Sequence, residues 1–441
     1  MRNILINTHI MLLEFSVGNY LSFKAKTTLS LVATPIKEHV DTNIFSTERY
    51  NLLKGAVIYG ANSSGKSNFI KAMSTMRRLV LQSFDQSSAN ELDIVPFLLS
   101  TETESKPSSF EAIFLIDNIR YRYGFEVNNN NIHAEWLFEA QKQAEKPLFI
   151  REQAGIEVMT KVFPEGKDLE ERTRDNALFL AVVDQFNGRI AKKIMRWFNN
   201  FITISGLRHE GYKGVTFGML EDKDTEKTLM DFYNKLDLGF DDITITQKPF
   251  DPKELPGNMP EGVLKHLVTD LEGAFKIDIK TIHKKFDSKD KLVGNIEFDM
   301  RSQESAGTNK LFNISGPVFD VLNDGGVLIV DELDASLHPL LTLAITKLFN
   351  SNVFNHNNAQ LIFATHDTNL LYYGNYRRDQ IYFIEKNKFG ASEIYSLVEY
   401  KEEGKTIRKD RSYEKDYIEG RYGAIPFIGN LSNVISEWQE R

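Results

Sequence analysis

Cysteine is absent from all 441 residues of the chain. Its absence excludes disulfide bonds, thiolate zinc sites and cysteine nucleophiles, and it is consistent with a reducing compartment. No apolar run reaches the length of about 18 residues that a membrane-spanning helix needs. The first ten residues, MRNILINTHI, are followed by no small-residue cleavage site, so we expect no secretory signal. These absences predict a cytoplasmic protein without a membrane partner.

An excess of positive charge is missing as well. The formal net charge of −8 excludes a protein that is basic over its whole surface, but a local basic patch for nucleic acid stays open. Hydrophobic residues make up 41% of the chain and charged residues 26%, which are ordinary values for a folded soluble protein. A chain of 441 residues is too long for one ordinary hydrophobic core, so we expect two structural units.

The hydrophobic pattern changes character along the chain. We predict an N-terminal extension (1–10), the first part of a nucleotide-binding head (11–160), a mainly helical insert (161–292), and the second part of the head with a charged tail (293–441). The predicted fold class is α/β, with a phosphate-loop sheet and its helices, an antiparallel β subdomain, and the inserted helical subdomain.

Local patterns support this division. In the first part, apolar periodicity predicts a helix from Lys66 to about Leu81, and turn-rich connectors predict an antiparallel meander over residues 110–140. The insert contains two amphipathic stretches, 176–198 and 226–240, and no sustained heptads, so a long coiled-coil arm is not expected. Four prolines then interrupt the pattern: Pro249, Pro252, Pro256 and Pro260.

The stretch VIYGANSSGKSNF has the spacing of a phosphate-binding loop between a buried strand and a helix. Its glycines let backbone N–H groups curl around phosphate, and the helix N-terminus adds positive potential. Lys66 would reach the β- and γ-phosphates of ATP, and the Ser67 hydroxyl would ligate Mg²⁺. The alternative is a glycine turn with no ligand. The predicted nucleotide-binding residues are Gly60, Ala61, Asn62, Ser63, Ser64, Gly65, Lys66, Ser67 and Asn68.

An acidic pair follows a second buried strand in VLIVDELDASLHP. Asp331 and Glu332 are predicted at the C-terminal tip of that strand, which is the edge where such sheets bind ligands. Asp331 could hold Mg²⁺ directly or through water, and Glu332 could act as general base on the attacking water. Taken alone, an acidic pair after a strand is common and carries no function.

Two further stretches extend the pattern. In LIFATHD, His366 ends another buried strand and could sense the γ-phosphate, although a lone histidine is more often structural. In QESAGTNKLF, Ser305 can cap the following helix, and Gly307 lets a phosphate approach the backbone. With Thr308, this segment resembles the signature loop of ABC-type ATPases, Leu-Ser-Gly-Gly-Gln. A cap without a ligand is the alternative.

The order of these motifs is similar to the ATPase heads of the SMC, RecF and RecN group of ABC ATPases. It resembles more closely the small prokaryotic OLD-like, abortive-infection and RloA kind of AAA-family ATPase. The opening FSVGNYLSF and the stretches RRDQIYFIEK and YIEGRYGAIP carry this second resemblance. It covers roughly residues 11–150 and 293–430.

The resemblance implies roles for individual residues. Asn62 would touch the γ-phosphate, Ser305 and Gly307 would bind ATP held by a partner subunit, and Asp334 would lie at the dimer interface. The catalytic residues would be Glu332, His366 and Lys66. The signature departs from the family pattern, because it lacks the leading Leu and has Ala306 where Gly is usual. The usual glutamine after the phosphate-loop helix has no good candidate, since Gln82 and Gln86 are poor ones.

These motifs select among the classes that use a phosphate loop. A GTPase would need an Asn-Lys-x-Asp motif, and a kinase would need lid arginines; neither is evident. The resemblance instead implies an ATP-gated switch, a homodimer or higher oligomer formed through the heads, in bacterial anti-phage (abortive-infection) defence. Only 75 residues follow His366, too few for a nuclease domain, so a separate effector (a nuclease or toxin) is expected. The charged tail from Lys401 to Lys415 could dock it, or be a solvated surface.

Two other hypotheses stay open. The chain could be a RecF- or SMC-like DNA-repair clamp, in which basic residues contact DNA, or a nucleotide-bound scaffold with negligible turnover. The residue type at Glu332 argues against the scaffold, because a pure binder has no need of that carboxylate. The basic candidates are Arg189, Lys192, Lys193 and Arg196 in one stretch, and Lys284 and Lys285 in another.

Overall fold

The computed structural model describes residues 10–85, 87, 89–252, 262, 268, 271, 275–372, 376–402, 405–407 and 411–426. The predicted N-terminal extension therefore lies almost wholly outside the described residues. The chain forms two compact units, of which the second is the continuous segment Glu210–Gly316. The first unit combines the chain before it and the chain after it.

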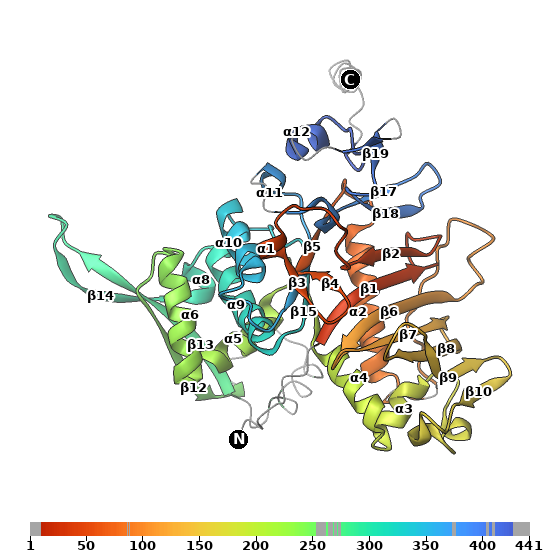
Figure 1. Cartoon of the computed structure of the whole chain (residues 1–441). Helices are drawn as coiled ribbons and strands as arrows, with labels where there is room; N and C mark the ends of the chain where they lie inside the picture. Colours follow the sequence, from red (N-terminus) through yellow and green to blue (C-terminus); the bar gives the residue numbers. More distant parts are fainter. Residues whose placement is uncertain are drawn as a thin grey trace, which may run out of the picture. The chain divides into compact units, whose positions relative to one another are not determined.

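A six-stranded sheet forms one layer of the first unit (Figure 1). Its strands, in spatial order, are β11 (Phe201–Ser205), β15 (Val327–Asp331), β16 (Gln360–Ala364), β5 (Gly55–Tyr59), β17 (Ile381–Lys386) and β18 (Ser392–Ser396). All neighbouring pairs are parallel except the last. Every residue of β5 and β16 is buried, which explains why both strands have nearly uninterrupted apolar sequences.

The second layer is an antiparallel seven-stranded sheet that includes the predicted meander. Its strands, in spatial order, are β10 (Gly155–Val158), β9 (Lys146–Glu152), β8 (Ile132–Ala140), β7 (Ile119–Val127), β6 (Ser108–Ile116), β1 (Ile10–Gly18) and β2 (Thr27–Ser30). One hydrophobic core takes side chains from both sheets and from α2 (Lys66–Gln82). The predicted α/β fold with an antiparallel β subdomain is confirmed.

The stretch 176–198, predicted as one helix of the insert, forms two helices that belong to the first unit. They are α3 (Phe179–Gln185) and α4 (Arg189–Asn199), separated where Asn187 adopts a left-handed φ of 69°. Trp197 of α4 is fully buried and stacks on Phe114 of β6 with ring centroids 4.1 Å apart. The next element, β11, follows α4 directly and forms an edge strand of the six-stranded sheet.

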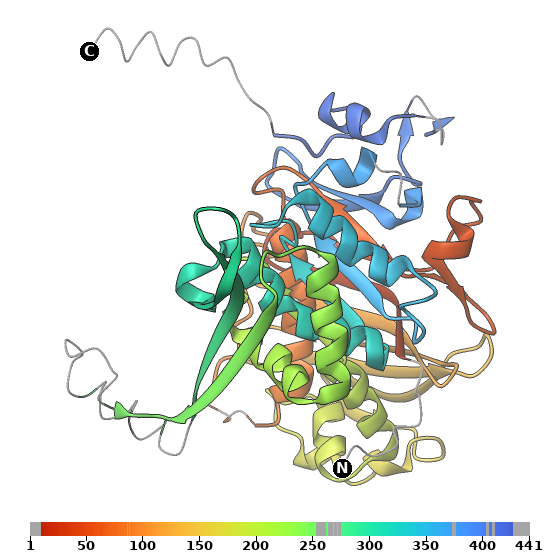
Figure 2. The ribbon, with the colours of Figure 1, turned by 90° about the vertical axis from the view of Figure 1, so that its left-hand side faces the viewer.

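The second unit is a mixed structure rather than a mainly helical one. An antiparallel sheet of β12 (Asp242–Pro249), β13 (Phe275–Phe286) and β14 (Leu292–Asp299) accompanies its helices, and β13 and β14 form a long hairpin (Figure 2). The helices are α5 (Lys213–Glu221), α6 (Lys223–Lys235), α8 (Met300–Gln303) and the start of α9 (Ala306–Asp324). The Thr216 hydroxyl donates to the Phe312 carbonyl at 2.8 Å and fixes α5 against α9. Pro256 and Pro260 lie outside the described residues.

Shorter elements complete the first unit. They are α1 (Val40–Asn43), β3 (Ile44–Ser46), β4 (Asn51–Leu53), α10 (Pro339–Asn350), α11 (Asn369–Tyr372), β19 (Lys401–Glu402), β20 (Lys405–Thr406) and α12 (Tyr413–Ile418). Among the residues that the structure describes, no helix is both long and apolar enough to cross a membrane.

Candidate nucleotide site

The predicted phosphate loop connects β5 to α2, as the sequence indicates. Gly65 stands directly before the helix with φ 118°, a conformation that residues with a Cβ rarely adopt. A Cβ at Gly60 would meet the Ile384 carbonyl oxygen at 2.5 Å, and one at Gly65 would collide with the Ser392 hydroxyl. Both glycines are therefore required by close packing as well as by the turn.

Lys66 is buried at the start of α2. Its Nζ donates hydrogen bonds to the carbonyl oxygens of Gly60 at 2.7 Å and Ala61 at 3.2 Å. Burial lowers the pKa of Lys66, and the nearby carboxylates of Asp331 and Glu332 oppose that shift. The amino group thus lies inside the loop and faces the acidic pair, so it can bind a phosphate that enters the loop.

The other loop residues differ in what they contact. The Ser392 hydroxyl donates to the Ser64 carbonyl at 2.5 Å, and the Asn68 amide donates to the Ser22 hydroxyl at 2.9 Å. Asn68 therefore ties α2 to the turn after β1. Asn62, Ser63 and Ser67 have exposed side chains.

Asp331 ends β15, and its carboxylate lies beside the Ser67 hydroxyl. Burial raises the pKa of Asp331, Ser67 opposes that rise, and Glu332 adds to it. Glu332 has φ 54°, in the left-handed region that is unfavourable for a residue with a long side chain. Such conformations concentrate at functional sites, where the surrounding structure holds them in place.

Gly206, which follows β11, is a part of this site that the sequence analysis missed. Its N–H donates to the Asp331 carbonyl at 2.7 Å, and a Cβ there would meet that oxygen at 2.5 Å. The neighbouring strand therefore holds the backbone of the acidic pair. The available signal is a glycine directly after the apolar run FITIS, which falls within the predicted insert.

His366 lies beyond the end of β16, next to the segment that follows the acidic pair. Its N–H donates to Asp334 Oδ2 at 3.2 Å, and the N–H of Leu333 donates to the Ala364 carbonyl at the same distance. Burial and Lys66 lower the pKa of His366, while Asp334, Glu332 and Asp331 oppose the shift. The structure thus gathers Lys66, Asp331, Glu332, Asp334 and His366 at one edge of the parallel strands.

The signature-like segment, Glu304–Thr308, belongs to the second unit. The Ser305 hydroxyl accepts the N–H of Thr308 at 3.1 Å, which is the predicted cap of α9. The preceding residue, Glu304, accepts hydrogen bonds from the His283 ring at 2.7 Å and the Thr281 hydroxyl at 2.5 Å. Ser305 is exposed and Gly307 half-buried, so the first turn of α9 is accessible.

The donor set fits Mg²⁺ and a nucleotide. Within the described part of the chain, four buried oxygens have no hydrogen-bond partner and lie at this site: Ser64 Oγ, Asp331 Oδ1, Asp334 Oδ1 and Asp367 Oδ2. Buried polar atoms without partners are rare in folded proteins, and a ligand would satisfy them. The described residues contain no cluster of three or more His, Asp or Glu side chains that could hold a metal. Magnesium held by few protein oxygens and by substrate phosphates is the usual arrangement at nucleotide sites.

The predicted basic patches are partly neutralised. On α4, Lys193 forms an ion pair with Asp117 at 2.8 Å, and Lys192 donates to the Asn187 side chain at 2.7 Å. On β13, Lys284 pairs with Asp241 at 2.5 Å. These contacts give no support to a DNA-binding surface.

Comparison with known protein families decides the wider class. A family model described as "AAA domain, putative AbiEii toxin, Type IV TA system" matches residues 56–371, which is well over half of the chain. The chain belongs to this AAA domain family. The match starts in β5 and ends in α11, so it includes the phosphate loop, the acidic pair and His366 of this AAA domain protein.

Solved structures with some similarity were also found. The SMC head domain from Thermotoga maritima is 12% identical, with a TM-score of 0.37, 87% of this chain covered and 98% of that one. A structure of the recombination mediator protein RecF, titled RecF-ATPrS, is 13% identical, with a TM-score of 0.33 and coverages of 88% and 99%. Similarity at this level carries no argument about function. No curated protein matches the chain significantly.

Proposed function

We propose that this AAA domain protein binds and hydrolyses Mg²⁺–ATP as an ABC-type ATPase, and that ATP gates its dimerisation. One observation carries the proposal: Lys66, the Ser67–Asp331 pair and Glu332 converge at the edge of the parallel sheet, beside His366. This edge is where open α/β sheets bind their ligands.

Each side chain has a chemical task in this proposal. The loop N–H groups and Lys66 bind the phosphates, and Ser67 and Asp331 would hold Mg²⁺. Bound Mg²⁺ would neutralise charge on the phosphate oxygens. Glu332 lies next to Asp331 at the open end of the sheet. In this position its carboxylate accepts a proton from the attacking water. His366, neutral at pH 7, can donate one hydrogen bond to the terminal phosphate.

The dimer is proposed to complete each site in trans. The first turn of α9 presents Ser305 and Gly307, whereas Thr308 is buried, and a helix N-terminus favours phosphate binding. In the proposed dimer this turn binds the γ-phosphate of ATP held by the other copy, and Asp334 lies at the interface. ATP would then join the two heads, and hydrolysis would release them.

The proposed biological role is defence, with the ATPase controlling a separate effector such as a nuclease or toxin. Its support is the family description, which names a putative toxin of a toxin–antitoxin system. Cells that express the protein with its neighbouring genes should resist phage infection. Glu332→Gln should abolish the resistance, and equal plaque counts with the wild type and the variant would refute the role.

The switch is tested by light scattering on Glu332→Gln, which should keep ATP binding and stop hydrolysis. We expect its mass to double with Mg²⁺–ATP and not with ADP. The matched control is Glu157→Gln, because Glu157 is an exposed glutamate on β10 and its loss changes the charge equally. A mass that is the same with both nucleotides rules out the gated dimer. Failure of wild type to bind ATP rules out the nucleotide site itself.

A further inference from the structure

A largely buried carboxylate stands directly before the first turn of α9. The side chain of Glu304 is only 9% exposed, and glutamate is rarely buried unless it is paired. Its Oε1 accepts hydrogen bonds from His283 Nε2 at 2.7 Å and from the Thr281 hydroxyl at 2.5 Å. Both donors belong to β13. The glutamate that replaces the leading Leu of the signature pattern therefore ties the turn to a strand.

The two donors are themselves held in place. Thr281 is fully buried and pairs with Phe298 of β14. The His283 ring packs on the Phe298 ring with centroids 4.4 Å apart, and His283 Nε2 lies 3.0 Å from the Thr281 hydroxyl. Because β13 is the central strand of its sheet, backbone pairing fixes the strand from which both donors extend (Figure 2). The Glu304 carboxylate is thus bound to a rigid part of the second unit.

The other contacts of the turn are made within the helical segment. The Asn309 side-chain amide donates to the Met300 carbonyl of α8 at 2.7 Å and to the Ser305 carbonyl at 3.1 Å. The Ser305 hydroxyl accepts the N–H of Thr308. These bonds close the turn on itself and join α9 to α8. Glu304, by contrast, is the residue of the signature-like segment whose side chain bonds to the sheet among the contacts described here.

The direction of the carboxylate matters for a phosphate ligand. Since both donors lie on β13, Glu304 points toward the sheet, whereas Ser305 is exposed and Gly307 half-buried. Like charges repel, so a carboxylate that turned outward would oppose a phosphate at the first turn of α9. The bonds from His283 and Thr281 therefore hold the turn and keep its negative charge away from the accessible side.

We infer that Glu304 is a positioning residue of the ATP-dependent dimer, and that it holds Ser305 and Gly307 where they meet the γ-phosphate of ATP bound by the other copy. The inference rests on the proposed function. Without the carboxylate the turn gains conformational freedom, which dimer formation must then remove. The loss falls on dimerisation and not on ATP binding to the phosphate loop of the same chain.

The test introduces Glu304→Ala and Glu304→Gln separately into the Glu332→Gln variant. Light scattering over a dilution series with Mg²⁺–ATP gives the dimer dissociation constant. We expect Glu304→Ala to weaken each turn about tenfold, the effect of lost hydrogen bonds to a charged group, and hence the symmetric dimer about 100-fold. Glu304→Gln keeps the acceptor oxygen and should stay within about threefold of its parent. A fluorescent ATP analogue, titrated at protein concentrations where the chain is monomeric, should bind both variants within about twofold of the parent.

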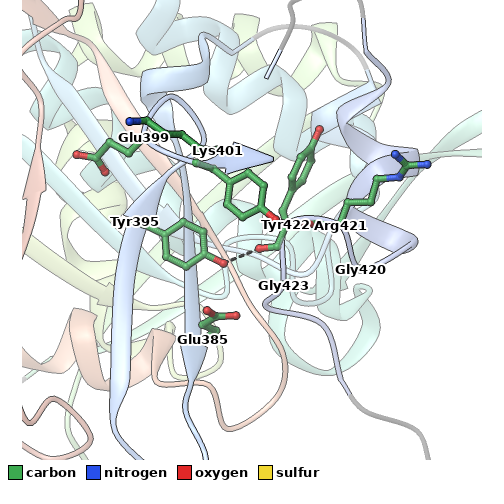
Figure 3. Close-up of a pocket in the computed structure, with 9 residues that line it drawn as sticks. Glu385, Tyr395, Glu399, Lys401, Gly420, Arg421, Tyr422 and Gly423 are labelled. Atoms are coloured by element: carbon green, nitrogen blue, oxygen red, sulfur yellow. Dashed lines mark hydrogen bonds between the residues drawn. The ribbon is translucent and has the colours of Figure 1, made fainter. Parts of the chain in front are cut away.

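The matched control is Glu399→Ala in the same parent. Glu399 belongs to the first unit and also accepts two hydrogen bonds, from the Ser396 N–H and the Ser396 hydroxyl, both at 3.0 Å. It lines an open pocket of about 510 Å³ together with Tyr395 and Tyr422 (Figure 3). Its loss removes the same chemical group without touching the signature-like segment. The dimer dissociation constant should therefore stay within about twofold of the parent.

A milder variant keeps the test valid if Glu304→Ala does not fold. Thr281→Val removes one of the two donors and keeps the shape of the side chain, so it should weaken the dimer about tenfold, with unchanged binding of the ATP analogue to the monomer. A Thr281→Val dimer as stable as its parent would overturn the inference.

The outcomes separate this inference from the proposed function. Equal dimer dissociation constants for Glu304→Ala and Glu399→Ala would overturn the role of Glu304, while the ATP-gated dimer stands. Weaker binding of the ATP analogue to the Glu304→Ala monomer would also overturn it, because the glutamate would then support the fold in general. If the Glu332→Gln parent does not dimerise with ATP, the proposed function fails and the inference fails with it.

Discussion

Gly206→Ala is the substitution that tests most directly how the acidic pair is held. The added Cβ would lie 2.1 Å from the Glu332 carbonyl oxygen and 2.5 Å from the Asp331 carbonyl oxygen. Both atoms are backbone, so no flexible side chain can move aside. Gly206 itself has an ordinary φ, and alanine can therefore adopt its conformation without strain. Any effect of the substitution comes from the close approach of β11 to the end of β15.

The magnitude follows from these distances. Non-bonded heavy atoms prefer separations of about 3.5 Å, so the two backbones must part by at least about 1 Å. Overpacking of this kind costs about 1–3 kcal/mol, which corresponds to a fall in Tm of roughly 2–10 °C. A misplacement of about 1 Å at a catalytic group can lower the rate about 100-fold. We therefore expect a modest loss of stability and a large loss of ATPase activity.

Thermal unfolding and steady-state ATP hydrolysis measure the two effects. The control is Gly218→Ala in α5, because among the described residues no other atom lies within 4 Å of the Cβ position there. That variant should keep its activity and gain up to about 1 kcal/mol of helix stability. A Gly206→Ala protein with wild-type Tm and ATPase rate would refute the claim that β11 fixes the acidic pair.

Two further predictions concern the charged groups of the site. Lys66→Ala should weaken ATP binding about 10- to 100-fold, because charge-assisted hydrogen bonds are lost, whereas Lys71→Ala, on the exposed face of the same helix, should not. Calorimetric titration distinguishes them, and equal affinities would contradict the assignment of Lys66. In the folded protein the pKa of His366 is lowered below 6.5, its ordinary value in the unfolded chain. The contribution of His366 to the free energy of unfolding is therefore complete above pH 6.5 and is lost as the pH falls towards the lowered pKa. Denaturant unfolding from pH 8 to 5 should show wild type losing stability relative to His366→Gln below pH 6.5, and parallel curves would show that the imidazole is not perturbed.

Much of the site could be predicted because its chemistry depends on local sequence. The glycine spacing with Lys66 and Ser67, and the carboxylates directly after an apolar run, each specify a strand end and a ligand type within a few residues. The meander was predictable for the same reason, since its turns join neighbouring strands. The division between the units was predicted wrongly. Residues 176–198 have an amphipathic helical pattern, but Trp197 of this stretch packs on Phe114, and the next element, β11, pairs with β15, far away in the sequence.

The sequence by itself determined which residues carry charge, hydroxyl groups and conformational freedom, and therefore which chemistry is available. Only the tertiary structure decided that β11 lies beside β15 and that Gly206 meets the acidic pair. The physical reason is sequence separation. Contacts between residues that are more than a hundred positions apart leave no periodic pattern in either segment, because periodicity and turn residues reflect only interactions between near neighbours in the sequence.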